Sequence, residues 1–340
     1  MTRYLNSSGV ERSAVRIERF GTIPAGPSRQ AETRAPRGPR ALVRITHASV
    51  GVTDVMAARG DYLLQPRRGF VPGYDLVGII EYLPSGDARG LRIGQRVAAV
   101  LPRMGAHATV IDVPTSLLVP IPDGLDSAIA ATVPLDAVTA GCALEALRPD
   151  GRPILVQGAG GAVGSWAVQL ASAGGRTVYG TASRRSREHA ERFGATVLDY
   201  GDFGWIDELR AITGGGVSAA IDHTGSRALR RAVRPSGRIV RIAFGGSPGT
   251  QCAATAAGSL ATQLRRYARP DERLCSVPML LMTRRDRCRR LLAELLAGVA
   301  AGRLIAPGPR LFALSDYAGA MAAAEAGDPG EKIVLTTDEH

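Results

Sequence analysis

The sequence predicts an α/β protein with two domains, one rich in β-strands and one built on a doubly wound parallel sheet. The chain has 340 residues, which is too many for one small core. Before residue 128, short strand-like runs are separated by turn residues. After it, short apolar strands alternate with helical segments, as in a parallel sheet covered by helices. We therefore expect the parallel-sheet domain at 128–285 and the β-rich domain at 1–127 and 286–340.

The β-rich domain is predicted from alternating and β-branched residues. Residues 21–40 are rich in Pro, Gly and Arg and predict an irregular connection. Strands are expected at 41–50, 76–82, 96–101 and 108–113. Towards the C-terminus the pattern predicts helices at 284–301 and 315–326 and a last strand at 332–336.

The parallel-sheet domain is predicted from strand and helix runs in alternation. Strands are expected at 153–156, 177–181, 218–222 and 238–243. Helices are expected at 164–173, 186–193 and 227–233. Glycine and polar residues follow the strands, where such sheets bind ligands.

A glycine-rich turn, GAGGAVG at 158–164, joins an apolar strand to a helix. A pyrophosphate must approach backbone N–H groups at a helix N-terminus without Cβ atoms in its way. Gly160 and the pattern Ala159-x-Gly161-x-x-Gly164 permit that approach. Because the motif lies between a strand and a helix, it predicts a dinucleotide site, with a structural glycine turn as the alternative.

The residues after the next strand predict which dinucleotide is bound. NAD-binding chains usually carry Asp or Glu about 20 residues after the turn. This chain has Ser183, Arg184 and Arg185 there. A guanidinium can pair with the 2′-phosphate of NADPH. We therefore favour NADPH over NADH, although a solvent-facing arginine pair is the alternative.

The basic charge is spread along the sequence. The net charge is +11, and all 42 basic residues except Lys332 are arginine. The arginine clusters, at 184–185, 230–231, 265–266 and 284–290, favour solvated helix faces over a nucleic-acid interface. Attraction of polyphosphate or of an anionic substrate is the other interpretation.

Cysteine usage and hydropathy place expectations on the compartment. The four cysteines, Cys142, Cys252, Cys275 and Cys288, have no C-x-x-C spacing, so we expect thiols in a reducing environment. No apolar run is long enough to span a membrane, and the N-terminus lacks a secretory pattern. A cytoplasmic protein is expected.

Nine segments in this order resemble the medium-chain dehydrogenase/reductase superfamily. The resemblance is closest to its quinone oxidoreductase branch, which includes VAT-1-like proteins. The segments are GVTDVMAARGDY (51–62), VPGYDLVGIIEYL (71–83), RIGQRVAAV (92–100), LVPIPDGLDSAIAATVPLDAVTA (118–140), GAGGAVG (158–164), FGATVLDYGD (193–202), GVSAAIDHTG (216–225), SGRIVRIAFG (236–245) and EKIVLT (331–336). It implies a GroES-like β-rich domain, built from both ends of the chain, and a Rossmann domain between them.

The resemblance also implies cofactor contacts and the absence of zinc. Thr139 would lie on the nicotinamide side, and Ala162 and Val163 against the pyrophosphate. Tyr200 would help to hold the adenosine phosphate, and Phe244 and Gly245 would follow the last cofactor-contacting strand. Zinc-dependent relatives have their catalytic ligands at positions that are Gly51, Tyr74 and Leu135 here, and none of these is an ordinary zinc ligand.

Few polar side chains are expected near the substrate. Gly51 replaces an asparagine that is usual in quinone reductases, which leaves Thr53, Tyr62 and Tyr74 as candidate catalytic donors. A packing role is the alternative for each. Asp54 and Asp75 occupy positions that are commonly structural in the family.

The sequence therefore predicts an NADPH-dependent, zinc-free reductase that transfers hydride to a quinone or an α,β-unsaturated carbonyl compound. One alternative is an enoyl-thioester or polyketide enoyl reductase, whose basic surface could hold an acidic carrier protein or CoA. Another is a protein that binds NADPH without turnover. A homodimer is expected from the resemblance, and nucleic-acid binding is not.

Overall fold

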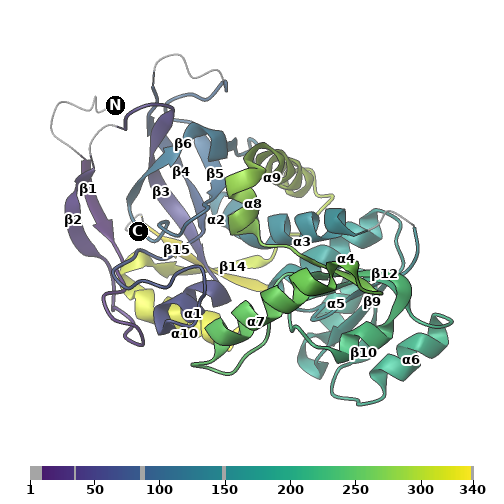
Figure 1. Cartoon of the computed structure of the whole chain (residues 1–340). Coiled ribbons are helices and arrows are strands. Elements are labelled where there is room, and N and C mark those ends of the chain that lie inside the picture. The colour runs from purple at the N-terminus through teal and green to yellow at the C-terminus, as the bar shows by residue number, and fades with distance from the viewer. Residues whose placement is uncertain (1–9, 34–35, 85–88, 148–150, 338–340) are drawn as a thin grey trace. The chain divides into compact units, whose positions relative to one another are not determined.

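The computed structural model describes residues 10–33, 36–84, 89–147 and 151–337 (Figure 1). The chain divides into two compact units, Met1–Leu135 with Pro278–His340, and Asp136–Val277. The sequence analysis placed these divisions eight residues away, after 127 and after 285. The first division moves because α2 (Ser127–Ala131) packs on strands of the first unit. α9 (Arg285–Ala300) packs on the segment 115–120 of the same unit.

The first unit is built on a seven-stranded sheet (Figure 1). Its strand order is β14 (Gly308–Ala313), β15 (Glu331–Thr336), β3 (Arg40–Val50), β4 (Asp75–Tyr82), β5 (Arg96–Val100) and β7 (Val119–Pro120), and β6 (Val110–Pro114) also pairs with β3. The four strands predicted at 41–113 and the last strand are confirmed. Because β15 pairs with β3, the C-terminal segment completes a sheet that the N-terminal segment begins.

A separate two-stranded sheet corrects one prediction for this unit. β1 (Val10–Ala14) pairs with β2 (Ser28–Thr33) in antiparallel orientation. β2 lies within 21–40, which we expected to be irregular throughout. The prediction was wrong there because β2, SRQAET, has no alternating apolar residues, and pairing with β1 supplies the hydrogen bonds that make it a strand.

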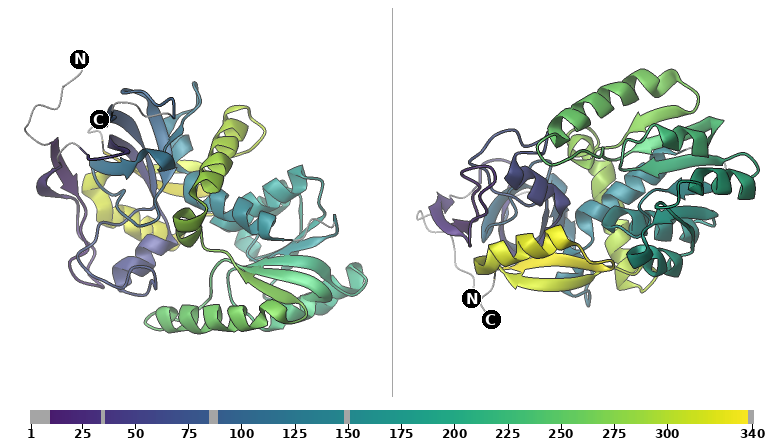
Figure 2. Two further views of the ribbon diagram at one scale, coloured as in Figure 1. Left: turned by 45° about the horizontal axis from the view of Figure 1, so that its top comes forward. Right: turned by 90° about the horizontal axis from the view of Figure 1, so that it is seen from below.

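Two helices cover the edge of this sheet around a buried apolar cluster. The cluster includes Ile17, Val50, Val55, Tyr317 and Leu335. Val55 comes from α1 (Val52–Arg59) and Tyr317 from α10 (Tyr317–Ala326). Figure 2 shows α10 lying along β14 and β15. The start of α1 is therefore held against the end of β3.

The second unit is a six-stranded parallel sheet with the order β10-β9-β8-β11-β12-β13. The strands are β8 (Ile154–Val156), β9 (Val178–Ala182), β10 (Ala195–Asp199), β11 (Val217–Asp222), β12 (Val233–Arg241) and β13 (Asp271–Leu274). The order reverses between β8 and β11, which is the topological switch point where such sheets bind dinucleotides. The predicted doubly wound sheet is confirmed.

Helices connect these strands. They are α3 (Pro134–Ala146), α4 (Ala162–Ala173), α5 (Arg187–Arg192), α6 (Trp205–Ile212) and α7 (Gln251–Leu264), followed by α8 (Val277–Thr283) in the connection to the first unit. The helix predicted at 227–233 is only a short 3₁₀ helix, Ala228–Ala232, because β12 begins already at Val233. No helix of the described residues is long and apolar enough to cross a membrane.

A buried histidine of the first unit contacts two segments that are far apart in the sequence. His107 is fully buried, and its Nε2 lies 3.0 Å from the carbonyl oxygen of Ser49. That carbonyl can only accept, so Nε2 carries the proton and Nδ1 accepts from the Tyr317 hydroxyl at 3.2 Å. Burial lowers the pKa of His107 below its ordinary value.

We expect this histidine to make the protein less stable in mild acid. The unfolded chain binds a proton at His107 below about pH 6.5, whereas the folded chain does not. The contribution of neutral His107 to the free energy of unfolding is therefore complete above that pH and is lost as the pH falls. The loss reaches about 2 kcal/mol near pH 5 for a folded-state pKa far below 5. Urea unfolding of wild type and His107→Gln from pH 7.5 to 5 measures this. Equal pH slopes for the two proteins would contradict it.

Candidate active site

The phosphate-binding turn of the second unit has the predicted geometry. β8 ends at Val156, Gly158 has a φ of +70°, and Gly161 caps α4. A Cβ on Gly164 would lie 2.0 Å from the carbonyl oxygen of Gly158, so α4 can pack this closely only without a side chain there. The N–H groups of the first turn of α4 thus face outward at a helix N-terminus.

Neighbouring segments fix the turn. The N–H of Ala159 donates to the carbonyl oxygen of Thr181 at 2.8 Å, and the N–H of Gly158 donates to the Thr181 hydroxyl at 3.1 Å. A Cβ on Gly160 would lie 2.5 Å from the carbonyl oxygen of Ser186. The turn therefore packs closely against the end of β9. Ala162 and Val163 form the first turn of α4, where Ala162 is exposed and Val163 half-buried.

The loop after β11 lies on the other side of the switch point. His223 Nδ1 is 3.2 Å from the carbonyl oxygen of Gln157, and the Thr224 hydroxyl oxygen lies 3.3 Å from Gln157 Oε1. The N–H of Gly245 donates to the carbonyl oxygen of Thr224 at 2.8 Å, and Phe244 is buried beside it. The structure thus brings Phe244 and Gly245 to the loop that borders the phosphate-binding turn.

The end of β9 carries the residues predicted to select the cofactor. The Ser183 hydroxyl lies 3.0 Å from that of Ser186. The Arg184 side chain is 96% exposed, with its Nε 3.8 Å from Asp199 Oδ2, and Arg185 is exposed. The sequence analysis missed Asp199, which ends the neighbouring strand β10 beside Ala182. An ion pair this exposed contributes little, so Arg184 remains available to an anion.

Two further predicted cofactor residues lie on other segments of the second unit. Tyr200 follows Asp199 and is 57% exposed. Thr139 lies on α3 and is half-buried. The contacts of Tyr200 with the adenosine phosphate and of Thr139 with the nicotinamide stay predictions.

The first unit brings the two candidate tyrosines together. The Tyr74 hydroxyl lies 3.2 Å from that of Tyr62, and the two rings meet edge to face with centroids 6.2 Å apart. Burial raises the pKa of Tyr62 to about 12, and burial also raises the pKa of Tyr74 well above its ordinary value. Both hydroxyls therefore stay protonated near neutral pH and can act as hydrogen-bond donors. Thr53 lies in the first turn of α1 and is half-buried.

Two buried carboxylates hold the backbone around these residues. Asp54 accepts from the N–H of Gly51 at 2.9 Å and from the N–H of Gly73 at 2.8 Å. Asp75 accepts from the Ser49 hydroxyl at 2.6 Å and from the N–H of Leu135 at 2.8 Å. The structure thus gives both the structural contacts expected of them.

The sequence analysis compared Gly51, Tyr74 and Leu135 with the zinc ligands of zinc-dependent relatives, and all three lie near the Asp54 or Asp75 carboxylate in the chain or by a hydrogen bond. Gly51 and Leu135 each donate a backbone N–H to one of the two carboxylates, and Tyr74 lies between Gly73 and Asp75 in the sequence. Among the described residues, no group of three or more His, Cys, Asp or Glu side chains is arranged to hold a metal ion.

Lys332, which the sequence analysis did not consider as a candidate, lies beside Gly51. It lies on β15 and is only 6% exposed. Its Nζ lies 3.3 Å from the place where a Cβ on Gly51 would stand. The only signal in the sequence was that it is the single lysine of the chain, which says nothing about where it lies.

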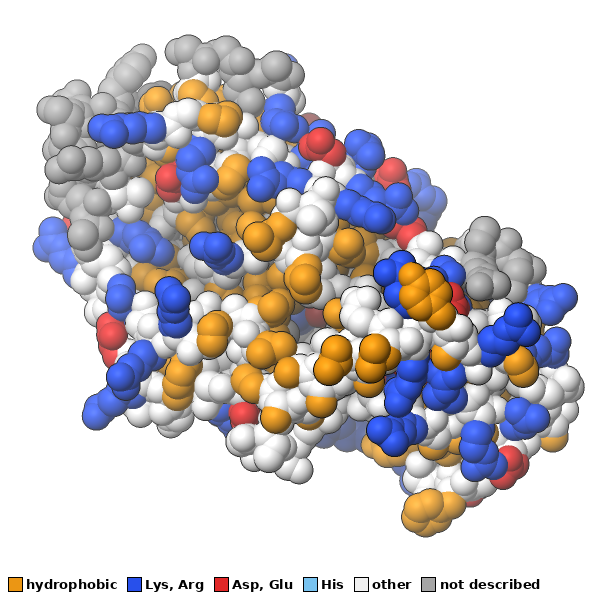
Figure 3. Space-filling view, in the orientation of Figure 1, with side chains coloured by type: hydrophobic (Ala, Val, Ile, Leu, Met, Phe, Trp, Pro, Cys, Tyr) orange, Lys and Arg blue, Asp and Glu red, His pale blue; other side chains and the backbone are white. Residues whose placement is uncertain are grey.

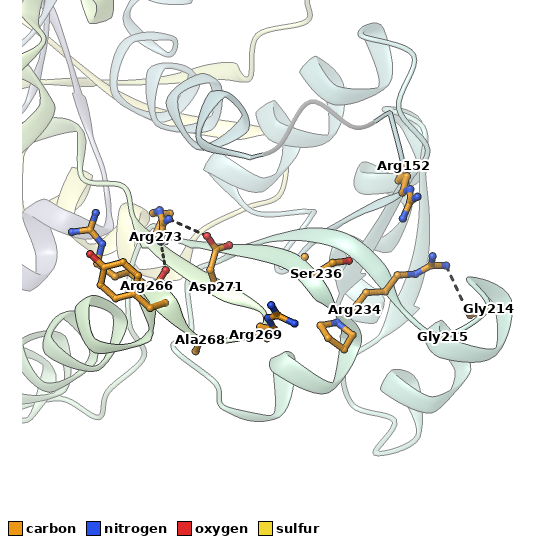
Figure 4. A pocket seen from close by; sticks show the side chains of 13 residues that line it. Arg152, Gly214, Gly215, Arg234, Ser236, Arg266, Ala268, Arg269, Asp271 and Arg273 are labelled. Atoms are coloured by element: carbon orange, nitrogen blue, oxygen red, sulfur yellow. Dashed lines mark hydrogen bonds and ion pairs between the residues drawn. The ribbon is translucent and has the colours of Figure 1, made fainter.

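A hollow of about 820 Å³ lies at the opposite edge of the parallel sheet from the phosphate-binding turn. It is bordered by the starts of β12 and β13, so it is not the predicted cofactor site. Five arginines and one aspartate line it, namely Arg152, Arg234, Arg266, Arg269, Arg273 and Asp271. Figure 4 shows Arg152 and Arg234 towards one end and Arg266 and Arg273 towards the other.

The wider surface is basic as well. Blue side chains are spread over the face drawn in Figure 3 and outnumber the red ones. Several arginines of the predicted clusters pair with carboxylates, since Arg230 contacts Glu272 and Arg231 contacts Asp207. Part of the basic charge is therefore structural.

Each of the two units contains a stretch that matches a known protein family. Residues 38–123 match the alcohol dehydrogenase GroES-like domain, and residues 162–267 match the zinc-binding dehydrogenase family. The chain belongs to the medium-chain dehydrogenase/reductase superfamily. The GroES-like and Rossmann domains predicted from the resemblance are confirmed. The Rossmann domain of this superfamily binds a nicotinamide cofactor.

Three relatives within the superfamily show how far the likeness extends. One component of the phenolphthiocerol/phthiocerol polyketide synthase of Mycobacterium tuberculosis is 30% identical over 99% of the chain, which spans only 15% of that protein. A trans-enoyl reductase of Penicillium crustosum is 34% identical over 54% of the chain and 56% of its own length. A quinone oxidoreductase of Rattus norvegicus is 28% identical over 63% of the chain and 67% of its own length.

A solved structure extends the likeness to nearly the whole chain. The human synaptic vesicle membrane protein VAT-1 homolog-like protein has 25% identity and a TM-score of 0.75. The match covers 97% of this chain and 100% of that one. Membership of the superfamily therefore rests on both units and not on the glycine-rich turn alone.

We expect Gly164→Ala to weaken dinucleotide binding by about tenfold or more, which corresponds to about 1.4 kcal/mol. The added Cβ meets backbone atoms of Gly158 and Ala159, so the turn itself must shift. Gly174→Ala is the matched control at the other end of α4, where a Cβ would lie 3.4 Å from its nearest neighbour. Titration of NADPH fluorescence measures both, and equal affinities for the two variants would contradict the expectation.

Proposed function

We propose that the protein is an NADPH-dependent, zinc-free reductase that transfers hydride to a quinone or an α,β-unsaturated carbonyl compound. The observation that carries the proposal is the dinucleotide turn at the switch point of β8 and β11, followed by arginine where NAD-binding chains carry a carboxylate. The similarity to a quinone oxidoreductase and to a trans-enoyl reductase supports this class of acceptor.

The preference for NADPH is supported by the residues after β9. Arg184 and Arg185 are exposed at the strand end, and Ser183 offers a hydroxyl group. A guanidinium can bind a 2′-phosphate through paired, charge-assisted hydrogen bonds. The carboxylate of Asp199 lies nearby, and its Oδ1 accepts the N–H of Gly201 at 2.8 Å. We propose that Asp199 shapes this turn and does not bind ribose.

The absence of zinc from the reaction is supported by the side chains at the three ligand positions. Glycine and leucine offer no side-chain donor atom, and burial keeps the Tyr74 hydroxyl protonated. Conjugated acceptors do not require a Lewis acid, because their carbonyl group already stabilises the developing charge.

The chain's own residues would bind and orient the reactants. NADPH supplies the hydride when it is bound at the turn. Tyr62 and Thr53 offer hydroxyl donors to a substrate carbonyl oxygen, and Tyr74 orients Tyr62 through their hydrogen bond. With no tyrosinate or exposed histidine required, the proton that completes the reduction comes from water.

We expect NADPH, and not NADH, to be oxidised with at least one conjugated acceptor. The test follows absorbance at 340 nm with a benzoquinone, a phenanthrenequinone, a simple enone and crotonyl-CoA. Arg184→Gln with Arg185→Gln should lower kcat/KM for NADPH by about 10- to 100-fold and leave NADH unchanged, because only NADPH carries the 2′-phosphate. Arg192→Gln, at the far end of α5, is the control. Tight NADPH binding without turnover on any acceptor would favour a non-catalytic binding protein.

A thioester substrate on an acidic carrier protein is the second candidate. It is favoured by the arginine-lined hollow and by the likeness to a polyketide synthase. Asp271, the one acid in the hollow, is already paired with Arg238 and Arg273. The hollow lies at the sheet edge away from the turn, so it suits a protein partner better than the substrate itself.

We expect Arg266→Gln with Arg269→Gln to raise KM about tenfold for crotonyl groups on an acidic acyl carrier protein, with a salt dependence that the variant loses. The neutral thioester S-crotonyl-N-acetylcysteamine should be reduced at the same rate by both proteins. Arg192→Gln with Arg303→Gln removes the same charge elsewhere. An equal effect of the two double variants would reject docking at the hollow.

We also propose a homodimer through β13. This strand lies at the edge of the six-stranded sheet. An edge strand can pair with the same strand of a second copy and so continue the sheet.

A further inference from the structure

The single lysine of the chain is buried beside the start of α1. Lysine is almost never buried unless it interacts with a polar group, and Lys332, which is only 6% exposed, does interact with other groups of the protein. The register of the sheet explains its position, because Ile333 on β15 lies opposite Val50 on β3. Lys332 is therefore next to Gly51, the residue that follows β3.

Three polar groups converge on the missing side chain of Gly51. From the place of its Cβ, Lys332 Nζ is at 3.3 Å, Thr53 Oγ1 at 3.9 Å and Asp54 Oδ2 at 4.0 Å. Asp54 is the acceptor of this set, and it also accepts two backbone N–H groups. The ammonium and the hydroxyl are the donors of this set, which we call the Gly51 recess.

The Gly51 recess is open on the side of the helix start. Gly51 and Thr53 are both partly exposed, and Val52 between them is 67% exposed. No side chain of residue 51 covers the ammonium. A small acceptor atom that approaches over Gly51 therefore meets Lys332 Nζ and Thr53 Oγ1 on the protein side.

We propose that the Gly51 recess binds the carbonyl oxygen of the substrate, with Lys332 as the charged donor. The inference rests on the proposed reductase function and assigns the group that stabilises the developing charge. When hydride from NADPH adds to the conjugated carbon, the π electrons move to the carbonyl oxygen, and NADPH becomes NADP⁺. The Lys332 ammonium holds the resulting enolate until water supplies the proton.

The test compares acceptors of different intrinsic reactivity. Lys332→Met should lower kcat/KM for a simple enone by about 100-fold, the loss that follows removal of one oxyanion donor. It should lower kcat/KM for benzoquinone much less, because the hydroquinone anion is already stable without help. If Lys332 were purely structural, Lys332→Met would lower kcat/KM for all acceptors by the same factor. That result would overturn the proposal.

A second variant leaves the lysine in place. Gly51→Ala has an ordinary backbone conformation, with a φ of −131°, but puts a methyl group over the ammonium. We expect enone turnover to fall about tenfold while NADPH affinity stays the same, since one approach of the oxygen is blocked. Gly308→Ala on the neighbouring strand β14, where a Cβ has ordinary contacts, is the control. Unchanged enone turnover in Gly51→Ala would contradict the recess.

A spectroscopic readout separates this inference from the proposed function. Reductive methylation with ¹³C-formaldehyde labels only Lys332 and the N-terminal amine, because the chain has no other lysine. In the presence of NADP⁺, the planar oxyanion 4-nitrophenolate should shift the Lys332 signal and leave the N-terminal signal unchanged. If wild type turned over no acceptor, the proposed function would fail, but a selective shift would still support the recess. Equal or absent shifts, or no labelling of Lys332 in the folded protein, would overturn the recess.

Discussion

Arg241 stands at the end of β12 with 1% of its side chain exposed, and the carboxyl edge of the second sheet is arranged around its charge. Burial by itself lowers the pKa of Arg241, but Asp222 and Glu272 raise it above its ordinary value, so the group stays charged. Arg241 donates to Asp222 on β11 and, at 3.2 Å, to Glu272 on β13. Removal of the Arg241 guanidinium would leave the buried Asp222 carboxylate without its charged partner, which typically costs about 3–5 kcal/mol. The guanidinium therefore ties β13 to the ends of β11 and β12.

The position of Asp222 at the end of β11 also fixes the conformation of the loop that borders the phosphate-binding turn. Besides Arg241, Asp222 accepts the Thr224 N–H at 3.0 Å, the Thr224 hydroxyl at 2.8 Å and the Gly225 N–H at 2.8 Å. Thr224 in turn contacts Gln157, one residue before Gly158. A chain of polar contacts thus runs from the buried guanidinium to the phosphate-binding turn. The turn is preorganised on both sides, by Thr181 on β9 and by this loop after β11.

How much the sequence could predict depended on how local each feature is. The turn at 158–164 and the strand before it are encoded within a dozen residues, so the pattern predicted them. Asp199 and the Gly51 recess were missed because strand pairing, and not sequence distance, brings their members together. β2 was missed for the same reason, since its polar sequence forms a strand only through β1. Arg241 resembled any other arginine until its two carboxylates were placed beside it.

The composition of the chain gives Lys332 a meaning that its local sequence does not. Of 42 basic residues, 41 are arginine, so this chain uses a guanidinium wherever a positive charge at the surface is enough. Guanidinium groups also serve inside, as Arg241 does between two carboxylates that match its planar fork. Beside Gly51 the space is different, because Nζ is already 3.3 Å from the place of a Cβ. A compact ammonium fits there, whereas a planar fork with five donors would need more room and more acceptors. The one position that keeps lysine is therefore one where the shape of the cation matters as well as its charge.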